Sequence, residues 1–100
     1  MSDPPIVDNR SAGRFELCVD GHLAQLVYRT DDDRLVLVHT EVPAALEGRG
    51  IGGALVSAAV DSAVESGMTV VPLCSFAREW LERHPDTARR APIDWPPAQD

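Results

Sequence analysis

The first third of the chain alternates apolar and polar residues in the manner of antiparallel strands. Over Arg14–Val19 apolar residues alternate with polar neighbours, with Cys18 as the exception, and an apolar pattern resumes over His22–Arg29. Asp20 and Gly21 separate the two runs, and an Asp-Gly dipeptide in that place is typical of a two-residue hairpin turn. We therefore predict a β-hairpin here and expect Cys18 to belong to its core.

Two further strands extend this hairpin. Leu35–Val38 is an unbroken apolar run, which indicates a central strand covered on both faces. The acidic segment Asp31–Asp33 precedes it as a solvated turn, and a first strand is expected near Ile6–Asn9. Pro43 ends the ladder, because proline has no N–H to donate. The chain up to Val42 is thus predicted to be an antiparallel meander.

After the meander, the spacing of apolar residues over Gly50–Ser66 predicts a helix. Gly67 is well placed to end this helix, since glycine readily adopts the left-handed conformation of a helix C-terminus. Small residues within the apolar stripe should let the helix approach the sheet closely. Over Gly50–Ser66 the stripe recurs at spacings of three and four residues and consists of Ile51, Ala54, Leu55, Ala58 and Ser62.

A short strand and a second helix follow. Met68–Leu73 is apolar and predicts a strand, and Ser75 is a candidate N-cap for a helix over Phe76–His84. A His-Pro step ends that helix, because the residue before proline disfavours the helical conformation. Glu79 and Arg83 are four residues apart and are expected to pair on its surface.

The larger side chains near the C-terminus are assigned to packing. Phe76, Trp80 and Leu81 are expected to face the sheet as core residues, with cofactor contact as the less favoured alternative. The segment Ala91–Asp100 contains three prolines and is expected to be an extended tail that Trp95 pins to the body.

Composition limits the chain to one domain and excludes a nucleic-acid partner. One hundred residues, of which 44% are hydrophobic and 25% charged, are typical of a single globular core. We expect residues 1–100 to form one domain, with its core over about 5–85. All nine basic residues are arginine, against sixteen acidic residues, which gives a net charge of −7 and leaves no basic face for nucleic acid. The acidic surface either attracts a cationic amine or only keeps the protein soluble.

The sequence gives no sign of a membrane segment, an export signal or a metal site. No apolar run approaches the roughly 20 residues that span a bilayer. The N-terminus carries acid and proline where a signal peptide has basic and apolar residues, so a cytoplasmic location is expected. Cys18 and Cys74 are then free thiols. His22, His39 and His84 are scattered without zinc-ligand spacing, and no metal is expected.

A glycine-rich turn precedes the first helix. It contains Gly48, Gly50, Gly52 and Gly53, with Arg49 among them. A helix N-terminus has unpaired backbone N–H groups and a partial positive charge, and glycines let a phosphate approach that backbone closely. The segment therefore suits a pyrophosphate, with an arginine to add a charged contact. The alternative is a turn that only packs the helix on the sheet, but the density of glycines favours phosphate.

Two other phosphate-binding patterns fit less well. Gly48, Gly50 and Gly53 have the spacing of a dinucleotide-binding turn. That fold needs the strand to run almost directly into the glycines and an acid at the end of the next strand, whereas Pro43–Glu47 intervenes here. A phosphate loop that ends in Gly-Lys-Ser/Thr is excluded, because the chain has no lysine.

Three segments together resemble the GNAT superfamily of acetyl-CoA-dependent N-acetyltransferases. They are His39–Pro43, Gly48–Gly52 and Val71–Cys74, and the resemblance covers most of the chain, about residues 15–85. It is greatest to the minimal, single-domain members. The resemblance implies an α+β fold with a mixed sheet: the meander, then strand–helix–strand–helix, without the further C-terminal strands of larger members.

The resemblance also implies acetyl-CoA as co-substrate. The strands Leu35–Val42 and Met68–Leu73 would be parallel neighbours that part at their ends, with the pantetheine arm in the gap. Glu47 departs from the Gln/Arg with which the superfamily's Gln/Arg-x-x-Gly-x-Gly/Ala loop begins, which removes that side-chain contact and leaves the backbone cradle. The implied cofactor-binding residues are Thr40, Val42, Gly48, Arg49, Gly50, Ile51, Gly52, Gly53, Cys74 and Arg78.

For catalysis, the resemblance implies attack of an amine on a thioester. His39 and Glu41 are the candidate bases; they share one face of their strand, and the sequence leaves open which way that face points. The alternative for each is an ordinary strand residue. Cys74 lies where a strand meets a helix, a position at which a thiol can be reactive, and it is the candidate to protonate the leaving thiolate or to accept the acetyl group. The alternative for Cys74 is a buried, inert thiol.

The sequence therefore predicts an N-acetyltransferase that acts on a primary amine: a protein lysine, an N-terminus or a small amine. A second hypothesis is a non-catalytic module that binds acyl-CoA, and a third is a dinucleotide-binding fragment with affinity for NAD. The acceptor and the oligomeric state are not predicted.

Overall fold

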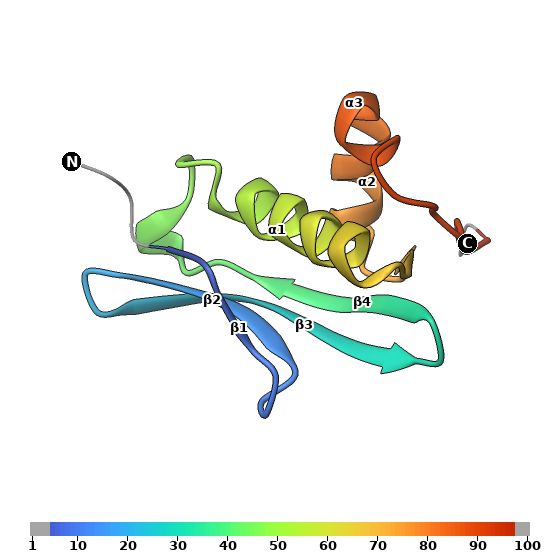
Figure 1. Cartoon of the computed structure of the whole chain (residues 1–100). Coiled ribbons are helices and arrows are strands. Elements are labelled where there is room, and N and C mark those ends of the chain that lie inside the picture. Colours follow the sequence, from blue (N-terminus) through green and yellow to red (C-terminus); the bar gives the residue numbers. More distant parts are fainter. Residues whose placement is uncertain (1–4, 98–100) are drawn as a thin grey trace.

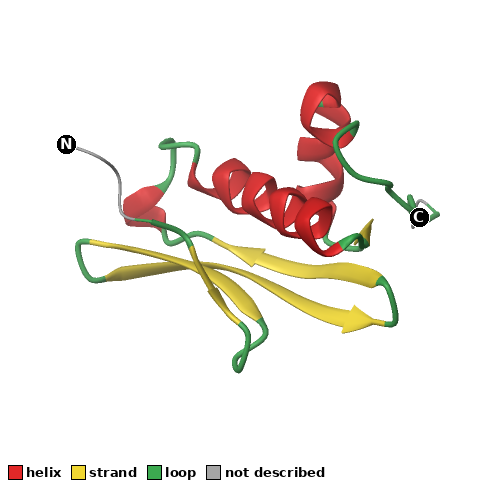
Figure 2. Ribbon diagram, viewed as in Figure 1, coloured by secondary structure: helices red, strands yellow, loops and turns green. Residues whose placement is uncertain are grey.

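A computed structural model describes residues 5–97 as a five-stranded sheet with helices packed against it (Figures 1 and 2). The helices are the 3₁₀ turn η1 (Ala44–Leu46), α1 (Ile51–Ser66), α2 (Ser75–Arg83) and α3 (Pro85–Ala88). The strands are β1 (Val7–Asn9), β2 (Arg14–Val19), β3 (His22–Asp31), β4 (Arg34–Glu41) and β5 (Thr69–Pro72).

The strands lie in the sheet in the order in which they occur along the chain. β1 to β4 are antiparallel neighbours, and β5 is parallel to β4. The predicted hairpin is confirmed, since Val19 pairs with His22 across a turn in which Asp20 and Gly21 have φ of 50° and 78°. The α+β class and the meander followed by strand–helix–strand–helix are confirmed as well.

Helix α1 lies across one face of the sheet and forms much of the core (Figure 1). Gly67 ends it in the left-handed conformation, as predicted, and its N–H lies against the carbonyls of Ala63 and Val64. The predicted stripe was partly wrong: Ala54 is exposed, because the side that meets the core is centred about one residue further round the helix. The buried residues of α1 are Ile51, Gly52, Gly53, Leu55, Val56, Ala59, Val60 and Ala63.

Helix α2 departs from the prediction at its start and on its surface. Its N-cap is Cys74 rather than Ser75, and the Cys74 carbonyl accepts a hydrogen bond from the Arg78 N–H at 3.0 Å. The expected Glu79–Arg83 pair is replaced by an ion pair of 3.4 Å between Arg78 and Glu82. The helix therefore starts one residue earlier than the side-chain pattern indicates.

Three assignments to the core also need correction. Cys18 is exposed, because its neighbour Leu17 faces the core and successive side chains of a strand point to opposite faces. Phe76 is 41% exposed, while Leu81 is buried as predicted. Val38 is 38% exposed, so the buried part of the central strand stops before it.

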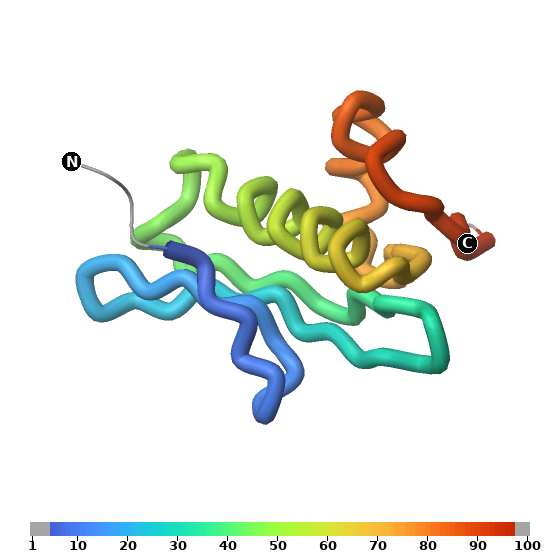
Figure 3. The backbone as a smooth tube through the Cα atoms, in the orientation of Figure 1, coloured from blue at the N-terminus to red at the C-terminus, as the bar shows by residue number. Residues whose placement is uncertain are grey.

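The tail is attached to the body through backbone hydrogen bonds and through the side chains of Ala91, Ile93 and Asp94. The Val70 N–H donates to the Pro92 carbonyl and the Asp94 N–H donates to the Val70 carbonyl, both at 2.9 Å. Arg90 pairs with Asp61 of α1 at 2.5 Å, and Figure 3 shows the tail passing the C-terminal end of α1. Trp95 is 43% exposed. Residues 98–100 of the predicted tail, and residues 1–4 of the predicted domain, lie outside the described part of the chain.

Candidate functional site

The parallel strands β4 and β5 part before β4 ends. Their pairing stops at Leu37 and Pro72, and one more hydrogen bond, from the Cys74 N–H to the Leu37 carbonyl, follows at 2.9 Å. β4 then continues to Glu41 without a partner in β5. The gap that opens here leaves one edge of β4 free beside the start of α2.

A β-bulge in β4 decides which side chains face this gap. Val27 of β3 pairs with His39, whereas Tyr28 pairs with Leu37, so Val38 is an extra residue on β4. Before the bulge the odd-numbered residues of β4, such as Leu37, face α1; after it the even-numbered Thr40 does. The bulge thus exchanges the two faces of the strand at the point where β4 leaves β5.

A cavity of about 400 Å³ lies where the end of β4, the start of α1 and the side of α2 meet. Four glycines of the turn before and within the start of α1, and two aromatic side chains of α2, contribute to its wall. Seven of the predicted cofactor-binding residues line it together. The complete lining is Thr40, Val42, Leu46, Glu47, Gly48, Gly50, Ile51, Gly52, Gly53, Phe76 and Trp80.

The four glycines of the turn have two different structural roles. Gly48 and Gly50 have φ of 81° and 73°, a conformation that other residues rarely adopt, and nothing lies within 4 Å of the position of a Cβ. Gly52 and Gly53 lie inside α1, and a Cβ on either would run into the aromatic ring of Phe76 or Trp80. The first two glycines shape an open turn, and the second two let α2 pack closely on α1.

The start of α1 keeps its polar backbone free. Gly50 is its N-cap, and no side chain in the described part of the chain, residues 5–97, caps the first turn. The first intrahelical bond runs from the Ala54 N–H to the Gly50 carbonyl at 3.0 Å. The N–H groups of the first turn have no partner within the helix, and the helix dipole makes this end electropositive. These donors lie beside the cavity and suit an anionic ligand.

Cys74 lies at the edge of the same region. Its side chain is 9% exposed, and its Sγ is 3.4 Å from Thr40 Oγ1, within hydrogen-bonding distance. Since Thr40 lines the cavity, this contact joins the thiol to it. The sequence resemblance implied such a neighbourhood, and the geometry brings the two residues together across the gap between β4 and β5.

His39 and Glu41 lie on the other face of β4. Their side chains are 61% and 63% exposed, and His39 Nε2 is 3.5 Å from Glu41 Oε2, an ion pair when the imidazole is protonated. Neither lines the cavity, whereas Thr40 between them does. The sequence left the direction of this face open; the two candidate bases point away from the glycine turn and the cavity.

The two predicted arginines lie apart from the cavity. Arg49 lines a smaller hollow of about 200 Å³ on the side of β2, next to Leu17 and Val19. Arg78 is held by Glu82 on another face of α2. Of the predicted cofactor-binding residues, these two are the ones that the fold does not bring to the cavity or to Thr40.

Sequence reasoning did not single out Leu46, which is fully buried under the cavity. It is the one buried residue of the short 3₁₀ turn η1, which is too short to show the apolar periodicity that identifies core residues in a sequence. Phe76 and Trp80 were assigned to packing, yet both line the cavity. Trp80 is further stacked on His84, with ring centroids 3.9 Å apart. Their spacing of one helical turn opposite two adjacent glycines was the available signal.

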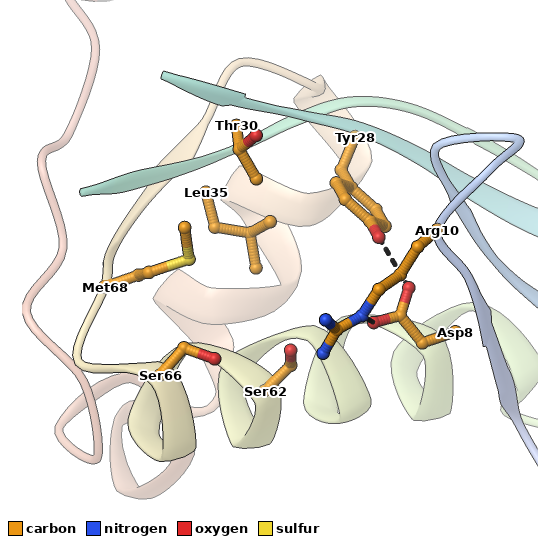
Figure 4. A pocket seen from close by; sticks show the side chains of 8 residues that line it. All are labelled: Asp8, Arg10, Tyr28, Thr30, Leu35, Ser62, Ser66 and Met68. Atoms are coloured by element: carbon orange, nitrogen blue, oxygen red, sulfur yellow. Dashed lines mark hydrogen bonds and ion pairs between the residues drawn. The ribbon is translucent and has the colours of Figure 1, made fainter. Parts of the chain in front are cut away.

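A second cavity, of about 280 Å³, lies beside the C-terminal half of α1 (Figure 4). Asp8 accepts hydrogen bonds from the Tyr28 hydroxyl at 2.5 Å and from Arg10 Nε at 3.4 Å. Burial and the hydrogen bond to Asp8 raise the pKa of Tyr28 to about 12. Ser62 and Ser66 of α1 face these groups across the cavity (Figure 4). None of the predicted site residues lines it.

Within residues 5–97, no helix has both the length and the apolar character needed to cross a membrane.

Comparison with known proteins adds a family, relatives and a similar structure. The family model described as GCN5-related N-acetyl-transferase matches residues 14–90. Protein NATD1 of Mus musculus is 38% identical over 80 residues, which cover 77% of this chain and 73% of that protein. Protein NATD1 of Homo sapiens is 38% identical over 63 residues, which cover 62% of this chain and 56% of that protein, so this match spans little more than half of the relative.

Among solved structures, the NMR solution structure of a GCN5-like candidate N-acetyltransferase from Staphylococcus aureus is similar with a TM-score of 0.71. The two chains are 27% identical, and the match covers 99% of this chain and 94% of the other.

Proposed function

Since this chain belongs to the GCN5-related N-acetyltransferase family, we propose that it transfers the acetyl group of acetyl-coenzyme A to a primary amine. One observation carries the proposal: a single cavity runs from the open start of α1 to Thr40, whose hydroxyl touches Cys74 across the parted strands. It joins an anion-binding end to a nucleophilic side chain, as a substrate with a pyrophosphate at one end and a thioester at the other requires.

The start of α1 fits the pyrophosphate. Gly48 and Gly50 are exposed in the left-handed conformation, and no side chain of the described residues caps the first N–H groups of α1. Such donors at an electropositive helix end bind phosphate oxygens well. Glu47, which lines the cavity, would be the unfavourable neighbour of an anion, so the backbone has to supply the affinity.

The free edge of β4 fits the pantetheine arm. Between Leu37 and Glu41 this edge has no partner in β5, so its N–H and C=O groups are available to the amides of an extended ligand. Val42 and Phe76 line the cavity and supply apolar surface for the methylene groups. The pantetheine arm, a linear chain with two amide bonds, can thus pair with β4 where β5 no longer does.

The groups that would transfer protons lie on opposite sides of β4. Acetyl-CoA supplies an acetyl group activated as a thioester. Glu41 and His39, on the exposed face, take the proton of the attacking ammonium, directly or through water. Cys74, on the cavity side, returns a proton to the leaving thiolate as the C–N bond forms and the C–S bond breaks. A backbone N–H near Val42 stabilises the negative charge that develops on the carbonyl oxygen.

The melting temperature with and without acetyl-CoA tests the binding part of the proposal, with NAD as the control. A ligand at about 100 times its dissociation constant stabilises a protein by roughly 2.7 kcal/mol. For a domain of this size the melting temperature should rise by about 10–20 °C. A rise with NAD instead would identify a dinucleotide-binding fragment, and no rise with either would leave the glycine turn a structural element.

Two substitutions separate an enzyme from a module that only binds acyl-CoA. Cys74→Ala and Glu41→Gln should each slow acetyl transfer by about 10²- to 10⁴-fold, the usual contribution of a general acid or base. The rise in melting temperature with acetyl-CoA should persist in both. Cys18→Ala and Glu65→Gln, at exposed positions away from the cavity, are the matched controls. A wild-type protein that binds acetyl-CoA and acetylates no amine would be the module.

A further inference from the structure

A third cavity lies beside the start of α2. It has a volume of about 360 Å³ and is lined by both chain neighbours of Cys74, Leu73 and Ser75. Its walls continue along α2 and are closed by the prolines of the tail at Pro96 and Pro97. The same cysteine contacts Thr40 of the first cavity at 3.4 Å. Cys74 itself lines neither cavity, but its chain neighbours line one and its contact residue Thr40 lines the other.

The charges in this third cavity are mostly acidic. Arg78, Glu79 and Glu82 come from one face of α2, at the helical spacing of three and four residues. Arg78 is paired with Glu82 at 3.4 Å, which neutralises one carboxylate. Glu79 has no ion pair or side-chain hydrogen bond within residues 5–97 and is exposed. One negative charge remains unbalanced, in a protein whose net charge is −7; the cavity is electrostatically suited to a cation.

The apolar part of the wall suits a hydrocarbon chain. Leu73, which directly follows β5, is 47% exposed and lines the same cavity as Pro96 and Pro97. A methylene chain that covered these side chains would remove apolar surface from water. A cavity with an acidic wall and an apolar wall is complementary to an alkylammonium ion.

The separation between Cys74 and Glu79 sets the length of that chain. Five residues of α-helix rise about 7.5 Å along the axis. An extended chain advances about 1.2 Å per bond, so six bonds, as between the nitrogens of 1,5-diaminopentane, span about the same distance. An amine at Cys74 can thus have a second ammonium group at Glu79.

On these grounds, and resting on the proposed acetyl transfer, we propose that the cavity lined by Leu73, Glu79 and Glu82 is the acceptor subsite and that the acceptor is a short aliphatic di- or polyamine. The remote ammonium binds the carboxylates of α2, and the methylene chain lies on Leu73 and the tail prolines. The near amine loses a proton to the base and forms the C–N bond, while the C–S bond breaks and coenzyme A leaves with a proton.

Binding without catalysis is the first test, because it does not depend on the acetyl-transfer proposal. Titration of the ¹⁵N-labelled chain with 1,5-diaminopentane should shift the amide resonances of Leu73, Ser75 and Glu79. The monoamine 1-aminopentane, which has the same chain and lacks the second charge, should bind about fivefold more weakly, the upper range for one exposed ion pair. Shifts confined to the acidic turn Asp31–Asp33, or equal affinity for the two amines, would overturn the proposal.

Kinetics with matched variants is the second test. Glu79→Gln should raise KM for 1,5-diaminopentane about fivefold, leave kcat within twofold and leave KM for 1-aminopentane unchanged. Glu65→Gln, an equal loss of charge on the exposed side of α1, should leave all of these constants unchanged. The acetyl-CoA-dependent rise in melting temperature should persist in both variants. An acceptor preference for a lysine-containing peptide over the diamine, or a KM insensitive to Glu79→Gln, would overturn the acceptor assignment while leaving acetyl transfer intact.

Discussion

The two ends of α1 carry cavities of opposite construction. The cavity at the N-terminal end is lined by glycines, apolar side chains and the uncapped backbone of the first turn. The cavity at the C-terminal end is lined by hydroxyls and charges, and its carboxylate, Asp8, is already bonded to Tyr28 and Arg10 (Figure 4). One helix of 16 residues, about 24 Å long, separates the two.

The difference shows that abundant polar side chains do not by themselves indicate a site of chemistry. Around Asp8 the charged groups and the tyrosine hydroxyl bond to one another, and the Tyr28–Asp8 bond holds β1 and β3 together. At the start of α1 few polar side chains are present, and the backbone donors of its first turn have no hydrogen-bond partner within residues 5–97. Groups left unpaired by the fold are the ones available to a ligand, so the barer cavity is the stronger candidate.

The largest effect is expected at the N-terminal end, from Gly53→Ala. Alanine in a helix interior is favoured over glycine by about 1 kcal/mol, but the new methyl would meet the Trp80 ring, and overpacking costs about 1–3 kcal/mol. We expect net destabilisation, together with loss of the acetyl-CoA-dependent rise in melting temperature, because α2 must move. In a Trp80→Ala background the same change should become stabilising, as chemical denaturation of the four proteins would show; destabilisation there would refute the packing account.

A smaller effect is expected at the C-terminal end, from Tyr28→Phe. The change removes a hydrogen bond to a charged group, which is worth about 1.5–3 kcal/mol when buried and less here because the site is partly solvated. The acetyl-CoA-dependent rise in melting temperature should be unchanged, since Tyr28 is at the far end of the helix. If Tyr28→Phe abolished that rise, the two cavities would be coupled, and the two ends of α1 would not act independently.

The alkaline limb of the stability profile isolates the same residue. A tyrosine whose pKa is raised to about 12 contributes stability that is complete below pH 10 and is lost as the pH rises through the folded pKa. Tyr28 is the only tyrosine, and the chain has no lysine, so few other groups titrate in this range. Tyrosinate absorbance should report the raised pKa in the folded protein and an ordinary one in denaturant. The loss of stability above pH 10 should be smaller in Tyr28→Phe.

The smallest effect is expected from Ser66→Ala. The side chain lines the Asp8 cavity but makes no side-chain hydrogen bond within the described part of the chain, and it is exposed. Changes at such positions usually stay within about 0.5 kcal/mol. Stability by denaturation and acetyl-CoA binding should both match the wild type. A large loss of either would mean that the hydroxyl of Ser66 has a ligand, and that the second cavity is more than structural.

The parts of the fold that follow local rules were predictable. Asp20-Gly21 specifies its hairpin and Gly67 its helix end, because each depends on the backbone preference of one or two residues. The bulge at Val38 was not predictable, since it depends on the register between two strands rather than on the strand itself. Unless the position of the bulge is known, the sequence does not show which face of β4 His39 and Thr40 occupy.

The candidate site was predictable in its glycines and only partly in its side chains. The density of glycines indicated an open turn, but sequence alone could not reveal that Gly52 and Gly53 accommodate Phe76 and Trp80, because that contact depends on how α2 packs. Arg49 was predicted to face the same ligand as its neighbours. It lies on the side of β2 instead, since successive residues of a turn need not share a face.

The bulge in β4 has a consequence for how such a chain can change. Inserting one residue into β3 between Val27 and Tyr28, opposite Val38, would restore plain alternation in β4, turn His39 and Glu41 toward the helices and turn Thr40 outward. The two faces of β4 meet different surroundings, and the register of the strand decides which side chains lie on each face. The ligands that such a fold binds can therefore change through a one-residue change in strand length as readily as through a substitution in the site.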